Sequence, residues 1–355
     1  MNFTVSIKDR DEPISVEMGR TILDAAMLAG GPFPHSCRSG NCGTCKCRLL
    51  SGEVEMSPFS EFALSADEEK RGFILACRAV PWSDCEIELA DEDDQMVHPM
   101  RDMACEVKAI TPLTHDIMSL RLSILSGGPF TFTPGQFADV ALPDQPARSW
   151  SMASQPDDDF LEFYVRILSD GRASRYLADH LQPGDQVRVK GPSGTAALRE
   201  ERRGPILAIA GGSGLSPIKS IIDRAAKLGW AEPVHFYFGV RDERDLYLVD
   251  HFEGLCAAHP HFHFTPVLSA PSDAVLKAAQ RRFGLVTDIV KEDLPHLSPS
   301  GTLEGFTAYL AGPPPMVEAA ERLLPDLGIA PNAIHADAFY SEADLKKADL
   351  EKETI

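Results

Sequence analysis

Four cysteines fall within eleven consecutive positions near the start of this 355-residue chain, in the segment CRSGNCGTCKC at 37–47. Three of them have the spacing C-x4-C-x2-C, and a further cysteine follows in the apolar segment ILACRAV. Gly40 and Gly43 lie between these thiols, and glycine can adopt positive φ and allow a close approach of the backbone. The segment therefore predicts a loop that folds around a small group held by converging thiolates.

The spacing of Cys37, Cys42 and Cys45, with Cys77 as the fourth thiol, is that of a plant-type [2Fe–2S] site. Zinc is the main alternative, but structural zinc sites usually pair two C-x2–4-C knuckles, and Cys77 has only Cys85 near it. A thioredoxin-like C-x-x-C is weaker still, because no βαβ pattern surrounds it. The other four cysteines are expected to be small buried residues: Cys47, Cys85, Cys105 and Cys256.

The net charge of −19 limits the kinds of macromolecule that the protein is expected to bind. Positions 1–98 carry 18 acidic and 9 basic residues, so acid is concentrated at the front. This charge argues against nucleic acid as a binding partner, and the partner is expected to be a protein with a basic surface. The sequence shows neither a signal peptide nor a long apolar span, which predicts a cytoplasmic protein without membrane segments.

Changes of pattern along the chain predict several domains. Residues 1–92 are expected to form a small α+β unit, and 93–101 a charged linker. Residues 102–202 contain short strands punctuated by Gly and Pro, which indicates an antiparallel barrel or sandwich. Strands alternate with helices over 203–340, which indicates a parallel sheet, and 341–355 form a charged tail with no assigned role.

These motifs resemble those of a known family. Residues 1–92 resemble a plant-type ferredoxin domain with a β-grasp fold, and the remainder resembles a ferredoxin–NADP⁺-reductase-type module. The whole is similar to the three-domain reductase components of bacterial multicomponent oxygenases, such as those of naphthalene and carbazole dioxygenases and of a guaiacol-demethylating cytochrome P450. The resemblance implies a β-grasp ferredoxin domain, an antiparallel β-barrel FAD domain and an α/β Rossmann-like NAD domain.

The resemblance implies an FAD site. RSWSMAS at 148–154 corresponds to the family's Arg-x-Tyr-Ser motif, so Arg148 would pair with the pyrophosphate. Trp150, in place of tyrosine, would stack on the isoalloxazine ring, and Ser151 would bond near the flavin N5. YVRILSDGRAS and GPSGTAAL match the two motifs that follow. The further expected FAD contacts are Ser149, Tyr164, Val165, Arg166, Gly171 and Ser174.

A nicotinamide nucleotide site is implied by AIAGGSGLSPIKS at 208–220 and LAGPPPM at 310–316. Ala311 holds the position where the family usually has a cysteine, and Ser216 the position of an alanine. Asp242 is expected to accept the ribose hydroxyls and favour NADH, although Arg241 argues the other way. The residues expected to contact the nucleotide are Gly211, Gly212, Ser213, Gly214, Asp242, Ala311, Gly312, Pro313, Pro314 and Phe339.

The expected function is electron transfer from NADH through FAD and the [2Fe–2S] cluster to a terminal Rieske dioxygenase or its ferredoxin. Trp150, Ser151 and Phe339 are the residues expected closest to the reaction, with Phe339 shielding the flavin face. Alternative acceptors are a cytochrome P450 or a diiron monooxygenase. A deoxysugar dehydratase reductase and a redox-sensing regulator are rival functions, and the protein is expected to be a monomer.

Overall fold

The computed structural model divides the chain into two compact units, Met1–Val97 with Tyr340–Ile355, and His98–Phe339. The linker expected at 93–101 lies partly outside the described residues, and the tail expected at 341–355 lies wholly outside them. The structure describes residues 2–29, 33–35, 38, 40, 43–59, 63–64, 66–89, 98–272 and 282–340.

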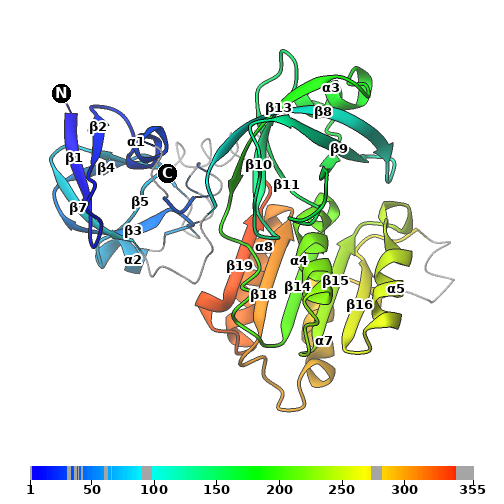
Figure 1. Ribbon diagram of the computed structural model, residues 1–355. Helices are drawn as coiled ribbons and strands as arrows, with labels where there is room; N and C mark the ends of the chain where they lie inside the picture. The colour runs from blue at the N-terminus through cyan, green and yellow to red at the C-terminus, as the bar shows by residue number, and fades with distance from the viewer. Residues whose placement is uncertain are drawn as a thin grey trace. The chain divides into compact units, whose positions relative to one another are not determined.

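The first unit is built on a five-stranded sheet of order β2-β1-β7-β3-β5 (Figure 1). Strand β1 pairs antiparallel with β2 and parallel with β7, which joins the first and last strands of the unit at its centre as in a β-grasp fold. Strands β4 and β6 form a separate two-stranded pair. The elements are β1 Asn2–Ile7, β2 Ile14–Glu17, α1 Ile22–Leu28, β3 Lys46–Ser51, β4 Val54–Met56, α2 Ala66–Lys70, β5 Phe73–Leu75, β6 Ala79–Pro81 and β7 Cys85–Leu89.

Helix α1 shows how local sequence sets this unit. The Thr21 hydroxyl accepts a hydrogen bond from the Asp24 amide at 3.2 Å, as expected for an N-cap. Ile22 and Leu23, directly after the cap, are fully buried in the core of the unit. The capped helix therefore closes over one face of the sheet.

The second unit begins with six antiparallel strands in the order β11-β10-β13-β8-β9-β12. A single bridge between Met152 and Phe163 joins the two edges, so the sheet is a nearly closed barrel rather than a sandwich. Its elements are β8 Arg101–Pro112, β9 Ile117–Ser126, β10 Phe137–Ala141, β11 Arg148–Ser151, β12 Leu161–Arg166, α3 Arg172–Asp179 and β13 Gln186–Ser193.

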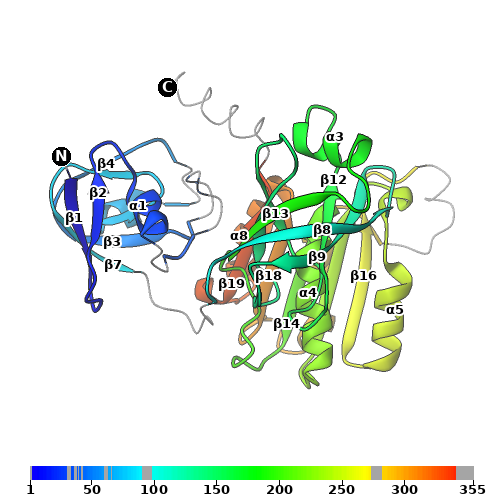
Figure 2. The ribbon, with the colours of Figure 1, turned by 45° about the horizontal axis from the view of Figure 1, so that its top comes forward.

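A six-stranded parallel sheet of order β17-β16-β15-β14-β18-β19 follows, and the barrel packs at one end of it (Figures 1 and 2). The parallel arrangement confirms the expectation for 203–340. The strand β19 was not expected from the sequence, which singled out only Phe339 in this part of the chain. The elements are β14 Ile206–Gly211, η1 Gly212–Gly214, α4 Leu215–Lys227, β15 Val234–Val240, η2 Glu243–Asp245, α5 Val249–Ala258, β16 Phe262–Leu268, β17 Arg282–Phe283, α7 Val286–Leu297, β18 Thr307–Gly312, α8 Pro314–Asp326, η3 Pro331–Ala333 and β19 Ile334–Ala338.

Strand β14 is apolar at successive positions because both faces of the sheet are covered. Ile206 and Ala208 pack in the cluster that contains α4 and α5. Leu207 and Ile209 point the opposite way, into the cluster that contains α7 and α8. Within the part of the chain that is described, no helix is long and apolar enough to cross a membrane.

Candidate functional site

Two of the four expected cluster ligands lie next to each other. Cys45 directly precedes β3, Cys77 lies between β5 and β6, and both are buried. The Cys77 amide lies 3.5 Å from the Cys45 sulfur and donates to it. A hydrogen bond to sulfur favours a thiolate and is one of the factors that set cluster potentials. Cys37 and Cys42 fall outside the described residues.

The glycines of the cysteine segment have the conformations that were expected. Gly40 has φ +78° and Gly43 has φ +71°. A Cβ at Gly40 would lie 2.8 Å from the Arg78 Cγ, and one at Gly43 would lie 2.9 Å from the Ala63 carbonyl oxygen. The backbone thus approaches its neighbours too closely for a side chain, and this thiol-rich segment fits an iron–sulfur cluster.

The remaining cysteines were expected to be small buried residues. Cys47 and Cys105 are fully buried, and Cys85 is nearly so, which confirms the expectation for these three. Burial raises the pKa of Cys105 to about 11, so its thiol stays protonated at neutral pH. Cys256 is only half-buried, contrary to expectation, because α5 lies at the surface there.

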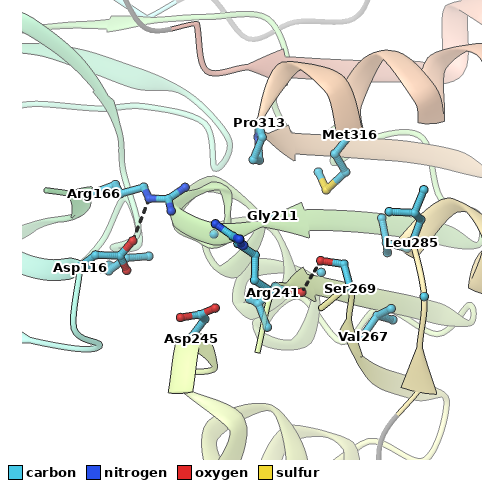
Figure 3. Close-up of a pocket in the computed structure, with 16 residues that line it drawn as sticks. Asp116, Arg166, Gly211, Arg241, Asp245, Val267, Ser269, Leu285, Pro313 and Met316 are labelled. Atoms are coloured by element: carbon cyan, nitrogen blue, oxygen red, sulfur yellow. Dashed lines mark hydrogen bonds and ion pairs between the residues drawn. The ribbon is translucent and has the colours of Figure 1, made fainter. Parts of the chain in front are cut away.

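A cavity of about 220 Å³ opens at the carboxyl ends of the parallel strands (Figure 3). This edge is where open α/β sheets bind ligands. The cavity is lined both by the ends of β14, β15 and β16 and by residues of the barrel. Its lining residues are Asp116, Ile117, Arg166, Gly211, Gly212, Gly239, Val240, Arg241, Asp245, Val267, Ser269, Gly284, Leu285, Val286, Pro313 and Met316.

The glycine turn after β14 is packed on one side and open on the other. A Cβ at Gly214 would lie 2.1 Å from the Ala311 carbonyl oxygen, and one at Gly211 would lie 2.7 Å from the Met316 sulfur. Gly212 has φ +54°, and a Cβ there would find only the Arg166 Nη1, at 4.0 Å. The turn therefore lets the end of β18 and the start of α8 pack closely against it, and Gly212 borders the cavity. A glycine backbone that borders a cavity at a helix start fits a diphosphate.

Arg166 belongs to this cavity, whereas the sequence placed it on the FAD side. Its Nε lies 2.9 Å from the Asp116 Oδ2, and the guanidinium points toward the cavity (Figure 3). Asp116 follows β8 and Arg166 ends β12, so the barrel supplies one wall. A guanidinium in this position adds positive charge beside the glycine turn, which suits an anionic ligand.

Asp242 has a different environment from the one expected. Its carboxylate accepts hydrogen bonds from the Glu243 amide at 2.8 Å and the Ser272 amide at 3.2 Å, which lower its pKa. It caps η2 and does not line the cavity. Asp245 does line it, and its Oδ2 accepts from the Asp242 amide at 3.0 Å. Sequence reasoning missed Asp245, although the capping spacing of the two acids was a visible signal.

The RSWS motif forms β11 and meets the end of the parallel sheet. The Ser151 hydroxyl donates to the Asp337 Oδ2 at 3.2 Å, across 186 positions of sequence. The Phe339 amide donates to the Gly312 carbonyl at 2.8 Å. Trp150 is half-buried, with its ring 6.5 Å from that of Phe163. The structure thus gathers the expected flavin motif, the 311–314 loop and Phe339 into one region.

Arg148 and Ser149 complete this strand. The Arg148 side chain is half-buried, and its Nη1 donates to the Ala147 carbonyl at 3.1 Å. The Ser149 hydroxyl donates to the Asp139 Oδ1 on the neighbouring strand β10 at 2.6 Å. Ser149 is exposed, so this edge of the barrel is open to a ligand.

The other expected flavin contacts lie on β12 and at the start of α3. The side chains of Tyr164 and Val165 are buried in two different cores, and burial raises the pKa of Tyr164 well above its usual range. The Ser174 hydroxyl accepts from the Leu168 amide and donates to the Gly171 carbonyl, each at 3.2 Å. That hydroxyl therefore shapes the turn, and the amides at the α3 start fit a phosphate group.

Comparison with known families finds three domain models in the order that the motifs predicted. A 2Fe-2S iron-sulfur cluster binding domain matches residues 5–81, an oxidoreductase FAD-binding domain 104–198, and an oxidoreductase NAD-binding domain 208–322.

Individual proteins are similar over nearly the whole chain. The reductase component of the naphthalene 1,2-dioxygenase/salicylate 5-hydroxylase systems of Ralstonia sp. is 40% identical, covering 92% of this chain and 95% of its own. The crystal structure of the Amycolatopsis cytochrome P450 reductase GcoB matches with a TM-score of 0.77 at 34% identity, covering 95% of this chain and 98% of that one. The ferredoxin reductase in carbazole 1,9a-dioxygenase matches with a TM-score of 0.69 at 29% identity, covering 96% and 99%.

Proposed function

Because the chain belongs to the family of ferredoxin–NAD(P)⁺ reductase components of multicomponent oxygenases, we propose that it oxidises NADH and delivers the electrons to a terminal Rieske dioxygenase or its ferredoxin. The family combines a [2Fe–2S] domain with FAD-binding and NAD-binding domains in one polypeptide, and this chain has all three. We further propose that it acts as a monomer in the cytoplasm, the compartment that supplies NADH.

One observation in the second unit supports the proposed electron path. Ser151, assigned to the flavin, bonds to Asp337 of β19, and Phe339, two residues further on, bonds to Gly312 of the segment assigned to the nicotinamide, so the two sets of residues lie close together. When bound, FAD accepts hydride and releases electrons singly, and a [2Fe–2S] cluster carries one electron at a time. The protein has to bind, orient and shield, and no general base is required of its side chains.

The residue assignments follow from the positions described above. Phe339 would shield the place where nicotinamide enters, and Trp150 would stack on the flavin ring. The residues that we assign to FAD are Arg148, Ser149, Trp150, Ser151, Tyr164, Val165, Gly171 and Ser174. Those assigned to the nucleotide are Gly211, Gly212, Ser213, Gly214, Ala311, Gly312, Pro313 and Pro314, together with Arg166 and Asp245. Those assigned to the cluster are Cys37, Cys42, Cys45 and Cys77.

The proposed preference for NADH now rests on Asp245 rather than Asp242. The Asp245 carboxylate lines the cavity, where it would repel the 2′-phosphate of NADPH. Arg241 lines the same cavity and would attract that phosphate. We give Asp245 the larger weight because it is held by the η2 cap, whereas the Arg241 side chain is exposed and free to turn toward solvent.

The acceptor is proposed from the relatives. A ring-hydroxylating dioxygenase is favoured by the 40% identity with the Ralstonia reductase. A cytochrome P450 is the second candidate, because the GcoB structure gives a TM-score of 0.77. Reduction of a purified Rieske oxygenase and of a purified P450 by the same preparation, with NADH in excess, would separate the two by rate.

The test of the electron path uses the purified full chain and two artificial acceptors. Its absorption spectrum should show both a flavin and an iron–sulfur chromophore. Replacing Cys77→Ser should abolish NADH-dependent reduction of cytochrome c and spare that of ferricyanide, which takes electrons from the flavin. Cys256→Ser, a matched change at a half-buried position outside the cluster, should spare both. A colourless wild-type protein, or a zinc-containing one, would contradict the proposal.

A further inference from the structure

Helix α4 of the NAD-binding part is hydrogen-bonded to the main chain at the end of β11 of the barrel and directly after it. The Ser216 hydroxyl donates to the Ser151 carbonyl at 2.6 Å, and the Ser220 hydroxyl donates to the Ser154 carbonyl at 2.7 Å. Lys219 Nζ donates to the Ala153 carbonyl at 3.2 Å. Residues 216 and 220 are one helical turn apart and face the same side. One face of α4 thus holds the barrel backbone.

Ser216 differs from Ser220 in having a second role in the barrel. The strands β11 and β12 are joined by the Met152–Phe163 bridge. One position further along, the Tyr164 amide donates to the Ser216 hydroxyl at 3.3 Å, while that hydroxyl donates to the Ser151 carbonyl. The serine hydroxyl therefore bonds to both strands at once, to the Ser151 carbonyl on β11 and to the Tyr164 amide on β12.

The position of Ser216 in the fold places its two hydrogen bonds next to the nucleotide cavity. It is the second residue of α4 and follows the glycine turn that lines the nucleotide cavity. It is 1% exposed, so water cannot take over its hydrogen bonds freely. Removing the hydroxyl would leave a buried carbonyl and a buried amide without this partner, which is costly in a protein interior.

We propose that Ser216 is a positioning residue that couples the two cofactor sites. It ties the backbone of Ser151 and Tyr164, both assigned to FAD, to the helix that begins at the nucleotide-binding turn. The identity of the ligands in this inference rests on the proposed function, whereas the bridge itself is a property of the chain. Ser216 acts through Ser151 and Tyr164 and is not expected to touch either cofactor.

The test compares Ser216→Ala with Ser220→Ala in the full-length, FAD-loaded protein. Ser220 is the matched control because it is equally buried, lies on the same helix and donates to a carbonyl at nearly the same distance. FAD release on dilution, followed by flavin fluorescence, gives the dissociation constant. Hydrogen exchange of peptides overlapping at Tyr164 reports the bridge without reference to activity, and melting temperatures report general stability.

Ser216→Ala should raise the FAD dissociation constant at least tenfold and speed Tyr164 exchange at least tenfold, while Ser220→Ala changes each less than twofold. Equal effects of the two variants, or unchanged FAD binding in Ser216→Ala, would overturn the inference. If Ser216→Ala folds poorly, Ser216→Cys, whose thiol fills the site but donates weakly, carries the same expectations. Wild-type protein that binds no FAD would instead refute the proposed function.

Discussion

The substitution Gly214→Ala should impair the proposed nucleotide site while leaving the rest of the fold intact. The new Cβ would lie 2.1 Å from the Ala311 carbonyl oxygen and 2.7 Å from the Gly312 Cα. Real Cβ contacts are essentially never under 3.0 Å, and both neighbours are main chain, so the end of β18 at residues 311–312 must move by about 1 Å. Gly214 has φ −61°, so the backbone conformation itself tolerates alanine and the effect is one of crowding.

The magnitude follows from what this loop does. Overpacking of this kind costs about 1–3 kcal/mol of stability. A displacement of 1 Å at a positioning loop can lower a rate by about 100-fold, so kcat/KM for NADH with ferricyanide should fall by roughly that factor. The flavin spectrum should remain, because the atoms that the new Cβ would meet belong to Ala311 and Gly312, which are not assigned to FAD.

Gly254→Ala is the control for the crowding argument. Gly254 lies within α5, and a Cβ there would meet nothing within 4 Å. Alanine in an open helical position should stabilise the protein by about 0.5–1 kcal/mol and leave kcat/KM unchanged. A Gly214→Ala protein with kcat/KM within threefold of wild type would refute the assignment of the 311–314 loop to the nucleotide.

Two further predictions concern charge. The value of kcat/KM should be at least tenfold higher with NADH than with NADPH. Asp245→Asn should reduce this ratio, because it removes the repulsion of the 2′-phosphate and keeps an oxygen that accepts from the Asp242 amide. Equal kcat/KM values for the two nucleotides in the wild type would refute this role of Asp245. Burial, and then the charge of His263, lower the pKa of His235 to about 4, although Asp293 opposes this shift. Because the unfolded chain binds this proton first, stability should fall by up to about 1.4 kcal/mol per pH unit as the pH drops from about 6.5 to 4. Urea titrations should show a shallower pH dependence in His235→Phe, and an unchanged slope would contradict the assignment.

The sequence by itself determined features that depend on local chemistry. The cysteine spacing predicted a domain that matches the 2Fe-2S family model, and positive φ at Gly40 and Gly43 was predicted because only glycine adopts it freely. The alternation of strands and helices over 203–340 predicted a parallel sheet, because parallel strands need crossover helices to connect them.

Tertiary structure decided which side chains share a site. The hydrogen bond between Ser151 and Asp337, 186 positions apart, and the presence of Arg166 and Asp245 in the lining of the cavity follow from strand register and packing. The Ser216 hydrogen bonds likewise exist only because α4 packs where β11 and β12 meet. A residue's type and neighbours in sequence determine its conformation and chemistry, whereas its partners are set by long-range contacts whose geometry no local pattern encodes.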